Sequence, residues 1–321
     1  MAQDPTITVI IATYNSCGSL NYALRSLLRQ DYSNFEAWII GDACTDDSER
    51  IVAQFGDPRL NWFNLSRRVG FQSGPNNEGL RRARGRYIAY LGHDDLWFPN
   101  HLTELLSVIE EKKADFVHSV AALVGPEGIC DVNGIPGVAR SYAVRWVHPS
   151  SWMHRRDVIE SCGNWPLNRV ESGTLVDFAY QRQLFLAGKR FASCAQLTVI
   201  KFPSAFWRLY ALHGDYPQHA YSGQLEQDSQ KLQVSLYREI AYRFGREHEN
   251  AFILPALLKV RQGIYRSIKE WYGIDRWPLR QILKWRLQRI IKSYDLRRGL
   301  PKSDPKSDRE PIVTSQNTSK T

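Results

Sequence analysis

Two adjacent carboxylates follow a short apolar run in the first third of the chain. The run Tyr87–Leu91 is rich in strand-forming residues and predicts a buried strand, followed by Gly92, His93, Asp94 and Asp95. Carboxylates at the end of a buried strand are costly unless a cation neutralises them. Divalent cations such as Mg²⁺ and Mn²⁺ take carboxylate oxygens and often bridge them to substrate phosphates. The stretch therefore predicts a metal and diphosphate site at the two aspartates.

The same stretch also fits a simpler structural role. Asp95 or Asn100 can cap a helix that begins near Pro99, because a side-chain oxygen there accepts a free backbone N–H group. On this stretch alone the site and the cap are open alternatives. The elements that must position the aspartates favour the site.

Apolar strands alternate with helical patterns from the N-terminus up to these aspartates. The expected strands cover residues 6–12, 35–40, 60–65 and 87–91. Helical spacing of apolar residues predicts a helix after each of the first three, the third of them at 75–84. This order predicts an α/β fold with a doubly wound, mostly parallel sheet and helices on both faces.

Polar residues fall at the point where three of these strands end. They are Thr13, Tyr14 and Asn15 after the first strand, Asp42 after the second, and the His93 to Asp95 stretch. The carboxyl ends of parallel strands meet at one edge of the sheet, where ligands bind. Asp42 is placed to accept a ribose hydroxyl or a base N–H. No glycine-rich phosphate loop follows the first strand, so bound phosphates would need a metal.

Four stretches, in this order and spacing, resemble family 2 glycosyltransferases of the GT-A fold over residues 6 to about 210. They are Val9–Asn15, Trp38–Asp47, Asn77–Gly79 with Ala83–Tyr87, and Leu91–Trp97. The resemblance implies a nucleotide-sugar donor, with a UDP-sugar favoured, and a carbohydrate or lipid-linked acceptor. It also implies Mg²⁺ or Mn²⁺ and inversion at the anomeric carbon, in polysaccharide or glycoconjugate synthesis.

The resemblance also implies roles for single residues. Thr13 and Tyr14 lie against the base, Asp42 binds the base or the ribose, and Asp94 ligates the metal with Asp95 beside it. The expected donor site is completed by residues in or beside these stretches: Asn15, Asn77, His93 and Arg208. For Arg208, which would reach the leaving diphosphate, a surface salt bridge is an equal alternative.

Three positions depart from the family pattern. Gly41 and Gly92 stand where the family has acidic residues, and Asn76 stands where an arginine is frequent. Asp94 remains, so a metal site is still expected. His93 is expected to hydrogen-bond the ribose in place of the missing carboxylate. These departures leave the identity of the nucleotide open.

Inverting transfer needs a carboxylate that takes the proton of the attacking hydroxyl. The family places this base at the start of a helix after the acceptor loop, and Asp177, before an expected helix at 178–187, matches that position best. Glu171 is the second candidate. The alternative for Asp177 is a helix N-cap, which is compatible with a base because both place the carboxylate at the positive end of a helix. His148 and His154 are expected to be structural rather than catalytic.

The composition bounds the class of protein. The chain has 321 residues, of which 43% are hydrophobic and 23% charged, as in ordinary globular proteins. The start Met-Ala-Gln-Asp-Pro lacks the pattern of a signal peptide, and no apolar run reaches the ~18 residues of a membrane span. Five widely spaced cysteines form no metal or disulfide pattern. We therefore expect a cytoplasmic protein.

The net charge of +9 lies in the C-terminal part. Leu254 to Leu300 contains twelve Lys or Arg and three Asp or Glu, which equals the excess of the whole chain. Helical patterns with Trp271, Trp277 and Trp285 fit either a helix on an anionic membrane surface or one packed on the catalytic domain. The polar residues 301–321 predict a disordered tail.

The expected organisation is a catalytic domain at 1–222, with a nucleotide-sugar half to about 124 and an acceptor half after it, then a basic helical extension at 223–300. A loop is expected at 125–137. Two other functions compete: a metal-dependent nucleotidyltransferase, and a nonenzymatic protein that docks on membrane or nucleic acid. The first needs a glycine-rich basic loop that 12–16 lacks, and the second has no need for three polar strand ends, so no nucleic acid partner is expected.

Overall fold

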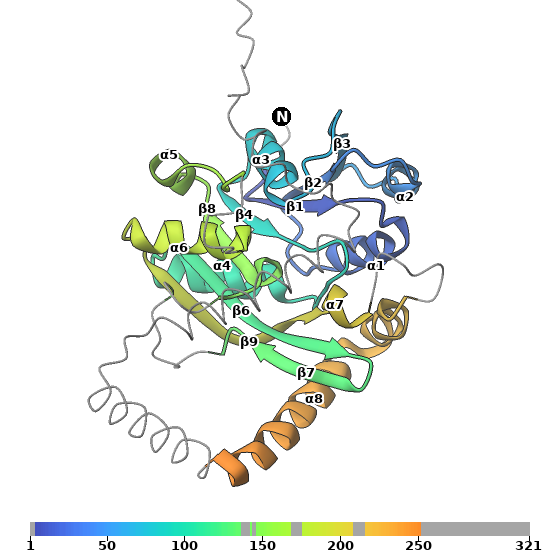
Figure 1. The fold of residues 1–321 in the computed structure, drawn as a ribbon, viewed down its shortest axis with the longest axis vertical. Helices are drawn as coiled ribbons and strands as arrows, with labels where there is room; N and C mark the ends of the chain where they lie inside the picture. The colour runs from blue at the N-terminus through green and yellow to red at the C-terminus, as the bar shows by residue number, and fades with distance from the viewer. Residues whose placement is uncertain (1–3, 136–141, 143–145, 168–174, 208–215, 252–321) are drawn as a thin grey trace, which may run out of the picture. The chain divides into compact units, whose positions relative to one another are not determined.

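A single sheet organises the part of the chain that the computed structural model describes, which is residues 4–135, 142, 146–167, 175–207 and 216–251 (Figure 1). Its strands are β1 (Ile7–Thr13), β2 (Phe35–Gly41), β3 (Leu60–Asn64), β4 (Tyr87–Tyr90), β5 (Leu96–Trp97), β6 (Phe116–Gly125), β7 (Gly128–Asn133), β8 (Trp152–Arg155) and β9 (Phe191–Lys201). Their order is β3-β2-β1-β4-β8-β6-β9-β5, and β7 pairs with the outer part of β6.

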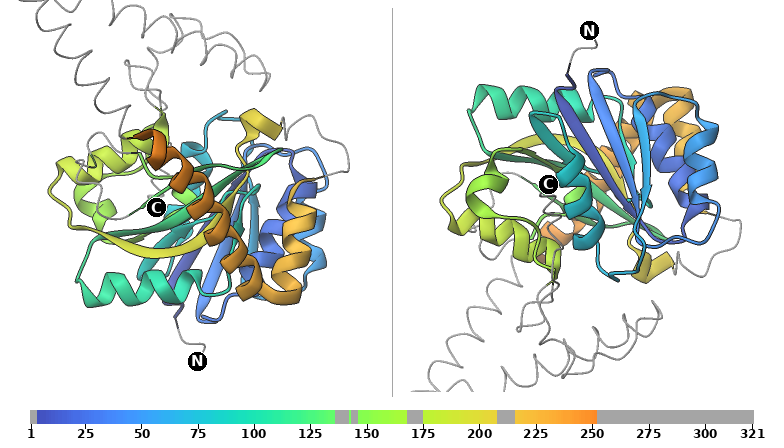
Figure 2. Two further views of the ribbon diagram at one scale, coloured as in Figure 1. Left: turned by 90° about the horizontal axis from the view of Figure 1, so that it is seen from below. Right: turned by 90° about the horizontal axis from the view of Figure 1, so that it is seen from above.

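The helices connect these strands and cover them. They are α1 (Cys17–Leu28), α2 (Ser48–Gln54), α3 (Ser73–Arg82), α4 (His101–Glu111), the 3-10 turn η1 (Pro149–Ser151), α5 (Val158–Cys162), α6 (Val176–Leu186), α7 (Ser204–Trp207) and α8 (Gln218–Ala251). Side chains along β1 alternate in direction, so Val9 packs with Leu24 of α1 while Ile10 packs with Leu80 of α3. Figure 2 shows α1 and α3 on opposite sides of β1, as expected for helices on both faces.

The N-terminal half of the sheet is parallel. β1 pairs in parallel with β2 and β4, and β2 pairs in parallel with β3. This confirms the predicted αβ alternation. Beyond β4 the sheet becomes mixed, because β8 runs antiparallel to both β4 and β6 while β9 is again parallel to β6. The mixed half coincides with the part of the chain after about residue 124, which was predicted to bind the acceptor.

The hairpin of β6 and β7 corrects the expected loop at 125–137. β7 pairs antiparallel with β6 from Gly125 opposite Gly128 to Ala121 opposite Asn133. Gly128 has a φ of 96°, a conformation that glycine adopts without strain, so it closes the tight turn. Ile129 is 2% exposed in the core. The glycine content that predicted a loop therefore belongs to the turn of a hairpin.

Helix α8 crosses the predicted domain boundary at 222. It buries Leu225, Leu232 and Leu236 in one hydrophobic cluster with Leu96 and Phe98. The α-helix expected from residue 225 is present but contains a break, since the φ and ψ of Asp228 are −159° and 88°. The described part of this extension thus shares a hydrophobic core with the sheet. The rest of the expected basic helical extension, from residue 252 to 300, and the tail lie outside the described residues.

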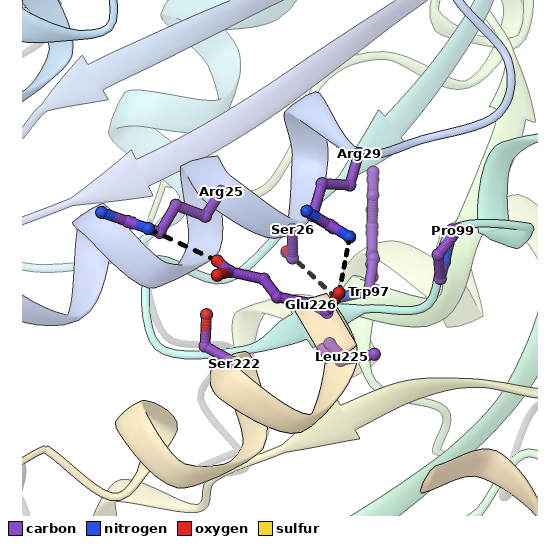
Figure 3. A pocket seen from close by; sticks show the side chains of 8 residues that line it. All are labelled: Arg25, Ser26, Arg29, Trp97, Pro99, Ser222, Leu225 and Glu226. Atoms are coloured by element: carbon purple, nitrogen blue, oxygen red, sulfur yellow. Dashed lines mark hydrogen bonds and ion pairs between the residues drawn. The ribbon is translucent and has the colours of Figure 1, made fainter. Parts of the chain in front are cut away.

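Polar contacts also join α8 to α1 around a small pocket (Figure 3). Arg25 forms an ion pair with Glu226 at 3.4 Å, and Arg29 donates to the backbone carbonyl of Glu226 at 3.1 Å. Both contacts are exposed, so each contributes little to stability. The buried leucines of α8, rather than these ion pairs, hold the helix in place.

Candidate active site

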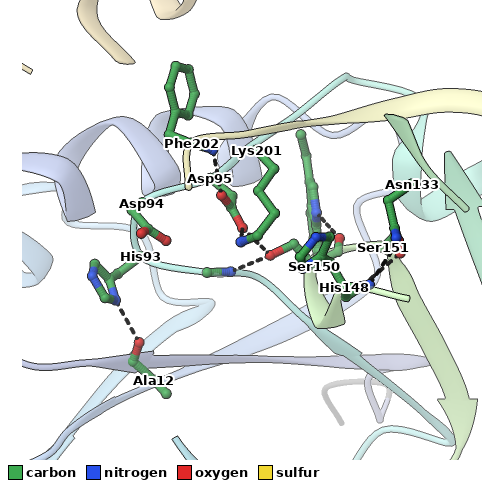
Figure 4. A network of polar contacts seen from close by, with 12 residues as sticks. Ala12, His93, Asp94, Asp95, Asn133, His148, Ser150, Ser151, Lys201 and Phe202 are labelled. Carbon is green, nitrogen blue, oxygen red and sulfur yellow. Dashed lines mark hydrogen bonds and ion pairs between the residues drawn. The ribbon is translucent and has the colours of Figure 1, made fainter. Parts of the chain in front are cut away.

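The three predicted strand ends meet at one edge of the sheet. The backbone N–H of Asp42, after β2, donates to the carbonyl of Thr13 at the end of β1, at 2.8 Å. His93 lies after β4 and donates its Nδ1–H to the carbonyl of Ala12 at 3.0 Å (Figure 4). Because a carbonyl can only accept, this bond fixes the hydrogen on Nδ1. Hydrogen bonds to the carbonyls of Ala12 and Thr13 therefore hold the segments after β2 and β4 against the end of β1.

Thr13 and Asp42 are buried at this edge of the sheet. Asp42 is 4% exposed, and its two oxygens accept the backbone N–H groups of Val69 and Gly70 at 2.7 and 2.8 Å. Thr13 is 2% exposed, and its Oγ1 is buried with no hydrogen-bond partner among the described residues. A buried hydroxyl without a partner is uncommon and requires an explanation. A bound ribose or base would satisfy it.

Tyr14 and Asn15 follow Thr13 directly, in the loop after β1. Asn15 has a φ of 42°, and its side chain pairs with Thr45, whose N–H donates to Oδ1 at 2.8 Å. The Arg68 guanidinium lies 3.7 Å from the centroid of the Tyr14 ring. Arg68 was not identified in the sequence because it belongs to none of the four family stretches. It covers one face of the ring that is predicted to lie against the base.

The structure explains the glycine that replaces the first acidic residue after β2. A Cβ at Gly41 would lie 2.5 Å from Oδ1 of Asn64 and 2.9 Å from the ring of Trp62. Asn64 uses its amide to accept from the N–H of Cys44 at 2.8 Å and to donate to its carbonyl at 2.9 Å. The space of the missing carboxylate is therefore filled by a neutral amide.

Asp95 has a different role from the predicted one. It is 0% exposed, and Lys201 donates to its Oδ2 at 2.9 Å while the N–H of Phe202 donates to its Oδ1 at 3.1 Å. The hydroxyl of Ser150 also donates to Oδ2 (Figure 4). With both oxygens bonded inside the protein, Asp95 is not placed to ligate a metal, and we replace that prediction by a structural role. Nor does it cap α4, whose N-cap residue is Asn100.

Asp94 differs from its neighbour. Its side chain is half-buried and makes no hydrogen bond within the described part of the chain, while its backbone carbonyl accepts from Gln218 at 2.8 Å. The described residues contain no cluster of three His, Cys, Asp or Glu side chains fit for a metal. A site with one protein carboxylate, substrate phosphates and water suits Mg²⁺. Asp94 is thus available for that arrangement.

Gly92 belongs to the same arrangement. A Cβ at Gly92 would lie 2.7 Å from Oδ2 of Asp95 and 3.0 Å from Oδ1 of Asp94. A larger side chain would therefore displace one of the two carboxylates. An acidic side chain at this position would therefore compete for space with the carboxylates of Asp94 and Asp95.

Lys201 lies at the end of β9, and the sequence analysis did not identify it. Burial would lower the pKa of its ammonium, but the negative charges of Asp95, Asp94 and Asp177 outweigh burial and raise that pKa above its ordinary value. Lys201 is therefore the cation toward which three carboxylates converge. A lone lysine at the end of an apolar strand carries no motif, which is why the sequence offered no indication of it.

Asp177 lies in the first turn of α6 and is 6% exposed. Burial raises the pKa of its carboxyl, and the opposing effects include the N–H of Phe178, the charge of Lys201 and the Gln72 side chain. The N-cap position is occupied by Leu175, so Asp177 does not cap the helix in the predicted sense. A buried, reachable carboxylate with a raised pKa suits a general base. Glu171 and Arg208 lie outside the described residues.

Asn77 is engaged elsewhere. Its Nδ2 donates to the carbonyl of Trp165 at 2.9 Å, and its Oδ1 accepts from the N–H of the same residue at 2.9 Å. Both ends of the amide are therefore used in a pair that joins α3 to the segment after α5. This corrects the prediction that Asn77 contacts the nucleotide.

The two histidines of the acceptor half differ. His154 is fully buried and donates Nδ1–H to the carbonyl of Arg155 at 2.7 Å, so its Nε2 accepts from the Tyr90 hydroxyl at 2.9 Å. Trp165 in turn donates to that hydroxyl at 3.0 Å. His154 is thus structural, as expected. His148 is 7% exposed, and burial and the charge of Lys201 lower its pKa, so this imidazole near the site is neutral.

Comparisons with known proteins find related sequences and related folds. The family described as glycosyl transferase family 2 matches residues 8–128. A glycosyltransferase of Rickettsia bellii is 34% identical over 39% of the chain and 18% of its own length. The Escherichia coli protein named UDP-Glc:alpha-D-GlcNAc-diphosphoundecaprenol beta-1,3-glucosyltransferase is 26% identical over 54% of the chain and 63% of its own length. The chain thus spans less than two thirds of these relatives.

Solved structures share the fold. TarS of Staphylococcus aureus, in complex with UDP-GlcNAc, matches 67% of the chain and 61% of its own with a TM-score of 0.54 and 20% identity. A mannosyltransferase of Pyrobaculum calidifontis, in complex with GDP-Man and Mn²⁺, matches 92% of the chain and 86% of its own with a TM-score of 0.52 and 17% identity. Residues 8–128 thus match glycosyl transferase family 2, and the described part of the chain shares the GT-A fold of these structures.

Proposed function

We propose that this protein is an inverting glycosyltransferase that moves a sugar from a nucleotide-diphosphate sugar to an acceptor hydroxyl. One observation carries the proposal. The carboxylate of Asp94, which makes no side-chain hydrogen bond among the described residues, and the buried carboxylate of Asp177 both raise the pKa of the Lys201 ammonium, which supports a metal ligand and a base near one cation. A transfer reaction needs these two groups on either side of the sugar that moves.

The donor nucleoside is proposed to bind at the edge formed by the loops after β1 and β2. The buried Oγ1 of Thr13, which has no partner, supports a hydrogen bond to the ribose or base. Asp42 holds the loop around Val69 and Gly70 against this edge. The complexes of TarS favour uridine, while the mannosyltransferase complex makes guanosine the second candidate. Tyr14, with Arg68 against it, would contact the base.

A divalent metal, Mg²⁺ or Mn²⁺, is proposed to be held by Asp94, and the Mn²⁺ complex of the mannosyltransferase supports this choice. When bound, such an ion neutralises charge on the diphosphate. Asp177 is proposed to take the proton of the acceptor hydroxyl. Burial raises its pKa and so increases its basicity relative to an exposed aspartate. If Glu171 is the base instead, Asp177 has only a structural role.

The acceptor is proposed to be a carbohydrate or a lipid-linked saccharide. The name of the Escherichia coli relative includes a diphosphoundecaprenol acceptor, and a Rhizobium meliloti relative is named a succinoglycan biosynthesis protein. The basic segment between Leu254 and Leu300 would bring the enzyme to an anionic membrane surface. Among the described residues, no helix is long and apolar enough to cross a membrane. We propose peripheral contact at the cytoplasmic face.

The catalytic unit is proposed to extend through α8, beyond the boundary first placed at 222, because Leu225, Leu232 and Leu236 are part of its core. A metal-dependent nucleotidyltransferase and a nonenzymatic docking protein are the competing functions.

Thermal unfolding with a panel of nucleoside diphosphates, with Mg²⁺, Mn²⁺ or EDTA, tests the proposal. Metal-dependent protection by UDP or GDP is expected. Transfer assays with UDP- and GDP-sugars then distinguish an enzyme from a docking protein, and protection by a nucleoside triphosphate alone would favour nucleotidyl transfer.

A further inference from the structure

The ammonium of Lys201 is paired with Asp95 and feels the negative charges of Asp94 and Asp177, the two groups that the proposed reaction needs. We propose that Lys201 binds the β-phosphate of the donor and stabilises the oxygen that leaves with it. This inference rests on the proposed function and adds a second cation to the site, one that belongs to the protein itself. It makes Lys201 a residue that touches substrate, although no family stretch includes it.

The position of this ammonium is fixed by an anchor that is itself fixed. Lys201 donates to Oδ2 of Asp95 at 2.9 Å, and Asp95 is 0% exposed. Asp95 is held by the N–H of Phe202 at 3.1 Å and by the hydroxyl of Ser150 (Figure 4). These contacts come from β9, from η1 and from the segment after β4. The charged end of Lys201 therefore cannot move far from the edge that carries Asp94.

The ammonium has binding capacity left. It carries three N–H donors, and in the described part of the chain it uses one of them, toward Asp95. Its side chain is 18% exposed, so the described residues do not enclose it completely. The charge of Lys201 also contributes to lowering the pKa of the buried His148 imidazole, so this neighbour is neutral. A ligand with acceptor oxygens would satisfy donors that the protein leaves unused.

The ammonium donor favours a phosphate oxygen over a sugar hydroxyl. One ammonium and one divalent cation together offset the three negative charges of Asp94, Asp95 and Asp177, so the site does not repel a diphosphate. The diphosphate gains a further negative charge when its bond to the sugar breaks. Ammonium groups stabilise phosphate oxygens through charge-assisted hydrogen bonds. The most favourable position for the leaving oxygen is therefore beside both cations.

The step balances as follows. The acceptor oxygen forms a bond to the anomeric carbon, and its proton passes to the carboxylate of Asp177. The bond between the anomeric carbon and the β-phosphate oxygen breaks, and its electron pair stays on that oxygen. The N–H groups of Lys201 bind this oxygen and keep their protons, because neighbouring carboxylates raise the pKa of the ammonium. The product diphosphate then leaves.

Titration calorimetry with a nucleoside diphosphate and its monophosphate tests the inference. The probe is whichever of UDP, GDP and ADP binds the wild-type protein most tightly, measured with Mn²⁺ and again with EDTA. Lys201→Met alone leaves Asp95 charged and unpaired, so the variant to use is Lys201→Met combined with Asp95→Asn, which keeps the shape of the pair. Lys231→Met, at an exposed position of α8, is the matched control. Circular dichroism checks that each variant is folded.

The double variant is expected to bind the diphosphate roughly 10- to 100-fold more weakly, the loss of a charge-assisted hydrogen bond, while the monophosphate is unaffected. With EDTA the wild-type preference for diphosphate should persist, and the double variant should lose it. Undiminished diphosphate binding by a folded double variant would overturn this inference and leave the proposed function intact. A wild-type protein that binds no nucleoside diphosphate would overturn the proposed function and this inference with it.

Discussion

Asp94 and Asp95 are neighbours in the sequence, yet the structure predicts opposite consequences for replacing them. Asp95→Asn removes the charge that pairs with Lys201 inside the protein. Breaking a buried ion pair by removing one partner costs about 3–5 kcal/mol. Because the Lys201 side chain retains 18% exposure, we take the lower end, about 3 kcal/mol. For a domain of this size that corresponds to a fall in Tm of roughly 6–12 °C.

Asp94→Asn should leave Tm nearly unchanged, because its carboxylate has no hydrogen bond to lose among the described residues. It should instead abolish the metal-dependent effect of nucleotide. At a nucleotide concentration of about 100 times Kd, binding stabilises a protein by about 2.7 kcal/mol, or roughly 5–11 °C for this size. Wild-type protein should show that rise with Mn²⁺ and nucleoside diphosphate, and Asp94→Asn should not.

Differential scanning fluorimetry of both variants, with and without nucleotide and metal, measures both effects in one experiment. The reasoning fails if Asp95→Asn keeps the wild-type Tm and loses the metal-dependent rise, since that result would make Asp95 a ligand. It also fails if Asp94→Asn lowers Tm as much as Asp95→Asn does. Equal loss of transfer in both variants decides nothing about roles, so binding and stability are the quantities to compare.

Further expectations follow from other contacts. Asp177→Asn should bind the donor normally and lose transfer by ~10²–10⁴-fold in a turnover assay; undiminished turnover would transfer the role of base elsewhere. Gly41→Asp should lower the unfolding free energy by about 1–3 kcal/mol in urea denaturation, because its Cβ would lie 2.5 Å from Asn64, and Asn64→Ala should recover part of the loss. Burial lowers the pKa of His154 from 6.5 to about 4, so the folded state binds fewer protons than the unfolded state. Stability present above pH 6.5 should therefore be lost as pH falls toward 4, by about 3 kcal/mol, and His154→Gln should show a smaller loss. Truncation after Ala251 should leave a folded unit with weaker sedimentation on anionic vesicles at low salt; equal binding by both proteins would refute the membrane proposal.

The sequence was sufficient to predict the parallel half of the sheet and the edge that carries Thr13, Asp42 and Asp94. Continuous apolar runs are typical of parallel strands, and polar residues at their ends mark a ligand edge. The family stretches then supplied the roles. Those roles follow chain position and do not depend on which atoms a side chain contacts. For that reason two adjacent aspartates received the same assignment, although one carboxylate is buried and bonded.

The rest of the site depends on tertiary contacts between distant segments. Lys201 and Asp95 are separated by 106 positions, and Asn77 and Trp165 by 88, so no local pattern records either pair. The strand β7 was not predicted, because the glycine content of the turn before it indicated a loop. The boundary at 222 was placed where the composition changes, whereas the buried leucines of α8 pack against strands far away in the sequence.

The packing of α8 also determines where this protein can be recombined with its relatives. Gln233 donates to the carbonyl of Leu197 at 2.7 Å, and the Tyr237 hydroxyl accepts from the N–H of the same residue at 2.7 Å. Leu197 belongs to β9, the strand that ends in Lys201. In a chimaera joined at residue 222, α8 would come from one protein and β9 from the other. The surfaces through which this helix and this strand contact each other would then fit poorly. A junction after residue 251 keeps α8 and β9 together, so only the segment that follows residue 251 can be exchanged between relatives.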